Sequence, residues 1–159
     1  LSDWGSPLGD RRGRGVALLY AFGMYLAEVA EVTVSKSGEA HVDRVVAVVD
    51  CGQVINPNTV EAQLQSGIIF GISAVLWGEI TLKDGRVEQS NFDNYRVLRI
   101  DEAPKIVVEI VKSSEAPGGI GEPGTSALAP AVLNAVYAAT GVRLRRLPIE
   151  GASAVLRSS

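Results

Sequence analysis

The chain has 159 residues, of which 47% are hydrophobic and 21% are charged, and its formal net charge is −3. This length is that of one domain, and the composition excludes disordered and collagen-like architectures. Because nucleic-acid-binding proteins usually carry a basic surface, this mildly acidic chain is not expected to bind nucleic acid. Cys51 and His41 are the only residues of their types, so the chain has no internal disulfide and no cysteine cage for an iron–sulfur cluster.

The N-terminal residue is Leu1 rather than methionine, so we expect the chain to be a piece of a longer protein. No basic segment followed by an apolar stretch opens the sequence, as a signal peptide would. The longest apolar runs fall short of the roughly 18 residues that a membrane-spanning helix needs, so no transmembrane segment is expected.

The N-terminal part is expected to be a loop followed by strands. Residues 1–15 contain several glycines and predict a loop. The basic cluster at 11–15 is interpreted as a solvated surface, with an anion or partner contact as the alternative. Residues 16–27 are almost all apolar and favour a strand, although Gly23 lies among them.

Two further strands are expected next. Alternation over residues 29–35 predicts a half-buried strand, and residues 36–39 predict a turn. The β-branched run over 42–49 predicts a central strand that is covered on both faces. His41 lies at its start and is interpreted as a surface residue rather than a ligand.

A long helix is expected to begin after Asn56 and to run to about Trp77, because asparagine followed by proline is typical of a helix start. Its apolar stripe consists of Val60, Leu64, Ile68, Ile72 and Val75. A second stripe contains Gln63, Gly67 and Gly71, and glycine within a helix costs about 1 kcal/mol relative to alanine. Two interpretations stay open: tight packing, or a flat face against a cofactor to which Gln63 would hydrogen-bond.

The second half of the chain predicts a hairpin over 79–89, an irregular segment over 90–105 and a strand over 106–111. A glycine-rich loop over 113–126 precedes a helix over 127–140. Thr125 or Ser126 is expected to cap this helix, and Gly141 is expected to end it.

The loop sequence Gly119-Ile120-Gly121-Glu122-Pro123-Gly124 matches the pattern G-x-G-x-x-G of dinucleotide-binding proteins. We reject that interpretation because several residues separate the loop from the preceding strand and the region after the helix is basic. Glu122 is the notable residue, since Pro123 favours extended angles for it and burial could tune it as a general base. The alternative is a turn glutamate that favours the helix dipole.

This loop resembles the Gly-x-Gly-Glu loop of the molybdenum hydroxylases, the family of xanthine dehydrogenase and aldehyde oxidase. Asp50-Cys51-Gly52, Asn56-Pro57 and Val60-Glu61-Ala62-Gln63 are similar to that family's preceding cofactor-contact segment. The isoquinoline 1-oxidoreductase branch and its aldehyde-oxidising relatives share further segments: Phe70-Gly71, Gly78-Glu79-Ile80-Thr81, Gln89-Ser90-Asn91-Phe92 and the tail 138–148. The resemblance covers about residues 4–149.

The resemblance implies the chemistry of a molybdenum hydroxylase, in which an aldehyde or N-heteroaromatic carbon is hydroxylated with oxygen from water. Glu122 would be the general base, and Gln63 would hydrogen-bond the molybdopterin. Gly119, Ile120 and Gly121 would lie beside the metal, with no side chain of this chain as a metal ligand. The implied cofactor is molybdopterin cytosine dinucleotide with molybdenum, and electrons would leave through a small partner subunit that carries iron–sulfur clusters.

One position departs from the family, because Phe70 stands where many members have a second glutamine. The family's site is also completed by upstream domains, so we expect this piece alone to be inactive. The expected fold is α+β, a mostly antiparallel sheet with two main helices, in a single domain over 1–159 that forms the C-terminal part of a longer subunit. A non-catalytic scaffold with the same fold is the alternative. The expected localisation is cytoplasmic, or periplasmic if an export signal lies upstream.

Overall fold

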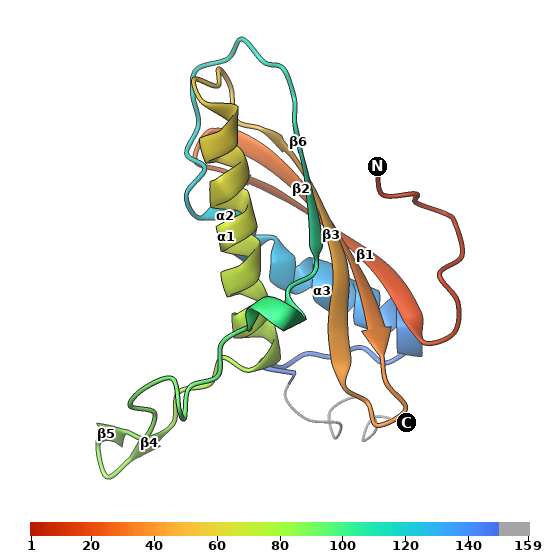
Figure 1. Ribbon diagram of the computed structural model, residues 1–159, viewed down its shortest axis with the longest axis vertical. Coiled ribbons are helices and arrows are strands. Elements are labelled where there is room, and N and C mark those ends of the chain that lie inside the picture. The colour runs from red at the N-terminus through yellow and green to blue at the C-terminus, as the bar shows by residue number, and fades with distance from the viewer. Residues whose placement is uncertain (150–159) are drawn as a thin grey trace.

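Four strands form the main sheet in the order β1-β2-β3-β6 (Figure 1). The computed structural model describes residues 1–149, so the last ten residues of the expected domain lie outside the described range. The strands are β1 (Arg12–Ala21), β2 (Met24–Val34), β3 (Ala40–Asp50) and β6 (Lys105–Ile110). The first three pair antiparallel, whereas β6 pairs with β3 in parallel. This mostly antiparallel sheet with two main helices confirms the expected α+β fold.

The apolar run over 16–27 is two strands rather than one. A two-residue turn at Phe22 and Gly23 separates β1 from β2, and the φ angles of these residues are 52° and 74°. Two consecutive positive φ angles are typical of the mirror-image turns that join twisted antiparallel strands. Phenylalanine is uncommon in such a turn. The apolar residues 16–27 therefore predicted extended chain correctly but gave no sign of the turn between the two strands.

The basic cluster at 11–15 lies mostly in β1, which corrects the predicted loop. Gly13 and Gly15 are buried under α3 (Leu128–Thr140), and a Cβ atom on Gly15 would lie 2.2 Å from the main-chain oxygen of Ala131. The glycines therefore let the helix backbone approach the strand directly. Arg14 is not a solvated cation, because its side chain is 9% exposed and pairs with Glu31.

The central strand β3 and the turn before it are as predicted. Val45, Val46 and Ala47 are all buried, whereas Arg44 and Val48 are partly exposed, so β3 is a central strand whose cover on both faces is partial. Gly38 lies in the turn with a φ of 88°. His41 is exposed, and its Nδ1 atom lies 3.0 Å from a carboxylate oxygen of Asp43, which confirms the surface interpretation.

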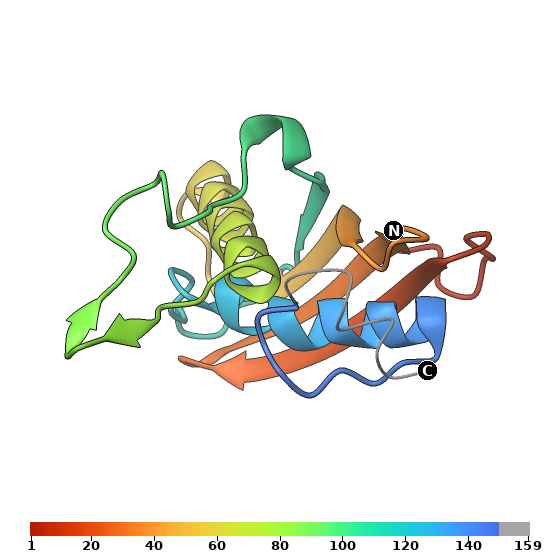
Figure 2. The ribbon, with the colours of Figure 1, turned by 90° about the horizontal axis from the view of Figure 1, so that it is seen from below.

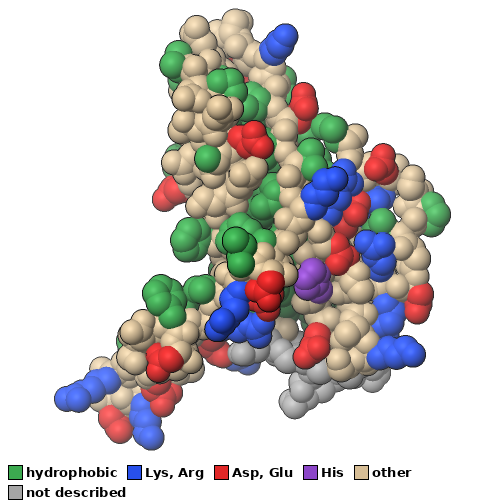
Figure 3. Space-filling model, in the orientation of Figure 1, with side chains coloured by type: hydrophobic (Ala, Val, Ile, Leu, Met, Phe, Trp, Pro, Cys, Tyr) green, Lys and Arg blue, Asp and Glu red, His purple; other side chains and the backbone are tan. Residues whose placement is uncertain are grey.

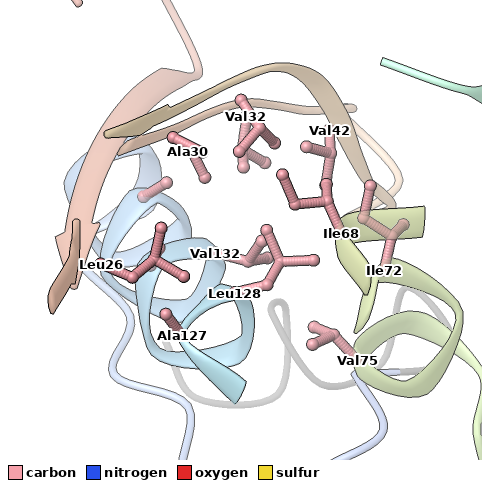
Figure 4. Close-up of a cluster of buried hydrophobic side chains, with 14 of the residues drawn as sticks. Leu26, Ala30, Val32, Val42, Ile68, Ile72, Val75, Ala127, Leu128 and Val132 are labelled. Atoms are coloured by element: carbon pink, nitrogen blue, oxygen red, sulfur yellow. The ribbon is translucent and has the colours of Figure 1, made fainter. Parts of the chain in front are cut away.

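Two long helices pack on one face of the sheet, which we call the helix-covered face. They are α1 (Pro57–Leu76) and α3, and the short helices α2 (Pro123–Ser126) and η1 (Ile100–Glu102) precede α3 and β6 respectively. Helix α3 lies along β1 and β2, and α1 stands at its side (Figure 2). Side chains of the sheet and both helices meet in one buried cluster (Figure 4), which includes Leu26, Ala30, Val32, Ile68, Ile72, Leu128 and Val132.

The ends of the helices show which capping predictions were right. The side chain of Asn56 accepts a hydrogen bond from the Thr59 amide at 3.2 Å, and Gly141 ends α3 with a φ of 75°. The predicted cap at Thr125 or Ser126 is wrong, because Ala127 is the N-cap residue of α3. The Thr125 hydroxyl instead donates a hydrogen bond to the Gly67 carbonyl of α1 at 3.0 Å.

Helix α1 is long and apolar enough to cross a membrane by length and composition. Half of its most apolar window is buried inside the domain, and all five residues of the predicted stripe are buried. This is the pattern of a core helix, and the extent of α1 confirms the predicted helix from after Asn56 to about Trp77.

A hairpin arm projects from the end of α1, away from the sheet (Figure 1). It contains the short strands β4 (Leu82–Lys83) and β5 (Arg86–Val87), which confirms the predicted hairpin. Charged side chains gather at its tip and over the strands on the opposite side of the molecule (Figure 3). At its base the guanidinium of Arg96 lies 3.9 Å from the ring centre of Trp77, which holds the arm to the helix.

Candidate functional site

The loop between β6 and α2 lies at the end of the sheet where β1 turns into β2, at the top of Figure 1. Its Gly118 amide donates to the Cys51 carbonyl at 2.9 Å, and its Gly119 amide donates to the Phe22 carbonyl at 2.9 Å. Cys51 follows β3 and Phe22 follows β1, so two strand ends hold the glycine pair. We call residues 118–122 the site loop.

Helix α1 holds the C-terminal side of the site loop. A Cβ atom on Gly67 would lie 3.1 Å from the Thr125 nitrogen, and one on Gly124 would lie 3.0 Å from the Leu64 carbonyl oxygen. Glycine on both sides thus allows α1 and α2 to pack backbone against backbone. The glycines of α1 are therefore explained by tight packing, which was one of the two interpretations, and this packing fixes the position of the site loop.

Glu122 is the N-cap residue of α2, directly before Pro123. Its φ and ψ angles are −112° and −24°, so its backbone is helical. The extended backbone predicted from Pro123 is therefore wrong. Helix α2 begins at the next residue, Pro123, and this overrides the usual preference of a residue before proline for extended angles. The side chain of Glu122 is exposed, so the described residues do not supply the burial that would tune a general base.

The structure brings the other predicted residues to the same end of the molecule. Gln63 is exposed on α1, next to Leu64, whose carbonyl oxygen faces Gly124. Ile120 is half-buried and packs against the core, which anchors the middle of the site loop. Gly119 and Gly121 are exposed on either side of it.

Gly121 differs from the other glycines named above because nothing in the described chain requires it. A Cβ atom at this position would have no neighbour within 4 Å, and its φ angle is not in the left-handed region. The open space beside its main chain is where a bound group could approach the backbone closely. The site loop therefore fits a large cofactor that lies against exposed main chain, with one amide and one carboxylate side chain nearby.

Sequence analysis missed Phe22 as part of this site, because its contact with Gly119 joins residues almost a hundred positions apart. Cys51 also contributes only through its carbonyl oxygen. Its side chain is buried, and burial raises the pKa of the Cys51 thiol, so this cysteine is a poor nucleophile. Within residues 1–149, no group of three or more His, Cys, Asp or Glu side chains could hold a metal ion.

Comparison with known proteins identifies the family. Residues 7–104, more than half of the chain, match the model of the molybdopterin cofactor-binding domain. The chain is 37% identical over 164 residues to the isoquinoline 1-oxidoreductase subunit beta of Brevundimonas diminuta, an alignment that covers 100% of this chain and 21% of that protein. It is 38% identical over 130 residues to the membrane-bound aldehyde dehydrogenase [pyrroloquinoline-quinone] of Gluconacetobacter polyoxogenes, which covers 81% of this chain and 17% of the relative.

A solved structure agrees with this assignment. The quinoline 2-oxidoreductase of Pseudomonas putida 86 superposes with a TM-score of 0.77 at 26% identity, over 85% of this chain and 18% of that one. The chain thus spans about a fifth of the length of these relatives. It is a cofactor-binding domain of the α+β type found in molybdenum-dependent oxidoreductases. The chain belongs to the molybdenum hydroxylase family, as the resemblance of its motifs had implied.

The family match includes Gln63 but stops before the site loop. The roles of Glu122 and of Gly119, Ile120 and Gly121 therefore stay predictions, carried by the motif and by the geometry of the site loop.

Proposed function

We propose that this chain is the C-terminal cofactor-binding domain of a molybdenum hydroxylase large subunit, which hydroxylates an aldehyde or N-heteroaromatic carbon with oxygen from water. The observation that carries the proposal is the site loop, which three elements hold firmly while Gly121 and Glu122 stay exposed. The names of the relatives support both substrate classes, since they refer to isoquinoline, quinoline and aldehyde.

Each predicted residue has a task that its position allows. The exposed amide of Gln63 would hydrogen-bond the molybdopterin, which would place the cofactor along α1 toward the site loop. The main chain of Gly119, Ile120 and Gly121 would lie beside the cofactor, because no Cβ atom at Gly121 blocks the approach. Molybdenum on molybdopterin cytosine dinucleotide would supply the redox centre that accepts the two electrons of the substrate.

Glu122 would accept the proton that the reaction releases, as a general base. Its position at the N-cap of α2 is compatible with this role, since its backbone is part of the helix start while its side chain is exposed and does not cap the helix. Because the side chain is exposed here, the remaining part of the subunit would have to exclude water from it. We therefore expect the chain on its own to be inactive.

The proposed assembly contains the rest of the large subunit and a small iron–sulfur subunit. The single cysteine of this chain cannot ligate a cluster, so the electrons would leave through clusters on the partner. The proposed location is the cytoplasm, or the periplasm if the full-length protein has an export signal.

The first test is elemental analysis of the full-length enzyme. About one molybdenum atom per large subunit supports the proposal. A subunit without molybdenum, purified from a host that makes the cofactor, contradicts it. A preparation with pyrroloquinoline quinone in place of molybdenum would assign the chemistry named for the aldehyde dehydrogenase relative, whereas a preparation with neither group would favour the scaffold alternative.

The second test is Glu122→Gln in the full-length enzyme. Turnover should fall about 10²- to 10⁴-fold, because a general base contributes a factor of this size, while the molybdenum content is retained. Glu115→Gln is the matched control, since Glu115 is an exposed glutamate in the same connection and should tolerate the change. Full turnover by Glu122→Gln would remove the catalytic assignment.

A further inference from the structure

Strand β1 forms one edge of the sheet and pairs only with β2 among the described strands (Figure 1). The pairing runs over all ten residues of β1 without a register shift, so the strand is long and regular. Soluble proteins usually protect such an edge with a lysine, a proline or a β-bulge, because its free backbone groups pair readily with another strand. Residues 16–21 contain none of these.

The direction of the free backbone groups follows from one hydrogen bond. The side-chain amide of Asn134 donates to the Val16 carbonyl at 3.1 Å, so this carbonyl points away from β2. Alternate residues of an antiparallel strand point their backbone groups the same way. The backbone groups of Leu18 and Tyr20 therefore face outward, whereas those of Ala17 and Leu19 bond to β2.

The two halves of this edge differ. At the N-terminal half, Trp4, Gly5 and Leu8 line one shallow hollow together with Arg12 and Gly13, and Arg14 donates a hydrogen bond to the Asp3 carbonyl at 2.8 Å. The N-terminal segment thus lies next to this part of the edge. In the other half, the Val16 carbonyl already accepts the hydrogen bond from Asn134, so we call residues 17–21 the free edge.

Apolar side chains accompany the free edge on the face of the sheet away from the helices. Leu18 is 75% exposed and Tyr20 is 65% exposed. On the neighbouring strand, Tyr25 is 55% exposed, and its ring centre lies 4.6 Å from that of Tyr20. No charged residue occurs between positions 16 and 27, so an apolar, extended segment fits this surface better than a charged one.

We propose that the free edge of β1 binds an extended, apolar segment from another part of the same large subunit, which adds to the sheet as a further strand. This inference rests on the proposed function, in which the chain is one part of a longer subunit. The relatives are about five times as long as the aligned chain, so most of such a subunit lies outside the residues described. A segment of the same polypeptide reaches the edge at an effective concentration in the millimolar range, which a separate subunit rarely matches.

The added strand would also affect the site. The free edge ends at Phe22, whose carbonyl accepts the hydrogen bond from Gly119 of the site loop. A strand paired with β1 up to this turn would restrict the motion of the turn. The turn would then hold the site loop through the hydrogen bond between Phe22 and Gly119. The added segment would therefore help to position the site loop, through β1 and the turn at Phe22.

Residue-resolved hydrogen exchange on the full-length enzyme tests the added strand. The Leu18 and Tyr20 amides should exchange as slowly as those of Ala17 and Leu19, about 100-fold or more below the rate of an unbonded amide. The alternate residues of the same strand are the internal control. Fast exchange at positions 18 and 20, with slow exchange at 17 and 19, would overturn the proposal.

Photo-cross-linking identifies the occupant. With p-benzoylphenylalanine in place of Leu18 in the full-length enzyme, we expect a cross-link to a peptide of the same subunit outside residues 1–159. The same group in place of Ile100, which is 96% exposed, is the control and should not yield that peptide. A cross-link to a second copy, to the iron–sulfur subunit or to nothing would overturn the proposal. Molybdenum content measured on the same sample reports separately on the proposed function.

Discussion

Two glutamates on β2, three residues apart, lie on opposite faces of the sheet and have opposite environments. Glu28 is fully buried on the helix-covered face, and neither of its carboxylate oxygens has a hydrogen-bond partner among the described residues. Glu31 lies on the other face, where its carboxylate accepts a hydrogen bond from Arg14 at 2.8 Å and another from Arg44 at 3.4 Å.

The comparison shows that the two faces are built for different purposes. The helix-covered face is so closely packed that Gly13 and Gly15 are required, and within residues 1–149 it offers the Glu28 carboxylate no hydrogen-bond partner. The outer face forms ion pairs at one end and leaves the aromatic pair Tyr20 and Tyr25 exposed at the other. The first face holds most of the apolar core of the domain, and the second is the face along which we propose that another strand is added.

The largest expected effect is on packing at Gly15. In Gly15→Ala the new Cβ atom would lie 2.2 Å from two main-chain atoms of α3, which cannot move as a flexible side chain can. We expect loss of the folded state, a cost comparable with the whole stability of a domain of roughly 5–15 kcal/mol. Circular dichroism during thermal unfolding measures this.

The matched variant is Gly121→Ala, whose Cβ atom meets nothing within 4 Å. Its unfolding temperature should stay close to that of the parent protein, while cofactor content or turnover of the full-length enzyme should fall. A folded, stable Gly15→Ala protein would show that α3 does not lie on β1 as described.

The next effect concerns Glu28. Burial raises the pKa of its carboxyl group from 4.5 to about 8, so folding takes up a proton between these two pH values. Its contribution to stability is complete below about pH 4.5 and is lost as the pH rises toward 8. From the size of the shift, this loss amounts to at most about 5 kcal/mol.

Unfolding by denaturant at pH 5 and at pH 8 measures this dependence. Glu28→Gln should reduce the difference between the two free energies of unfolding, because glutamine does not titrate. Glu109→Gln, at an exposed position of β6, should leave the difference unchanged. If the Glu28→Gln protein kept the full pH dependence, another group would be responsible.

The smallest effect lies on the outer face. Arg14→Gln should lower the free energy of unfolding by about 2 kcal/mol, because the largely buried Glu31 would keep only Arg44 as a partner. Removal of the last partner of a buried charge costs more, roughly 3–5 kcal/mol. Arg12→Gln is the control, since the pair of Arg12 and Asp43 is more exposed and should contribute under about 1 kcal/mol. Equal free energies of unfolding for the two variants would contradict the difference in burial.

Local signals in the sequence determined much of the fold. Asn56 and Pro57 start a helix, and Gly141 ends one, because the groups that satisfy a helix terminus lie within a few residues of it. The valine run of β3 and the alternation of β2 likewise report burial along one strand. The site loop and the motifs of residues 50–63 together also predicted the family, because their sequence and spacing resemble those of the molybdenum hydroxylases, and the family match over residues 7–104 confirms that assignment.

What the sequence left undetermined depends on contacts between distant residues. Only the tertiary structure decided that Gly13 and Gly15 serve α3, that the Thr125 hydroxyl bonds to α1, and that Phe22 holds Gly119. The same is true of Glu28, which looks like any strand glutamate until both of its neighbouring strands and α3 are in place. Alternation along a strand predicts which residues share a face of the sheet, because side chains alternate between the two faces. It does not predict which of the two faces a helix will cover, since this is decided only when the helix packs on the sheet.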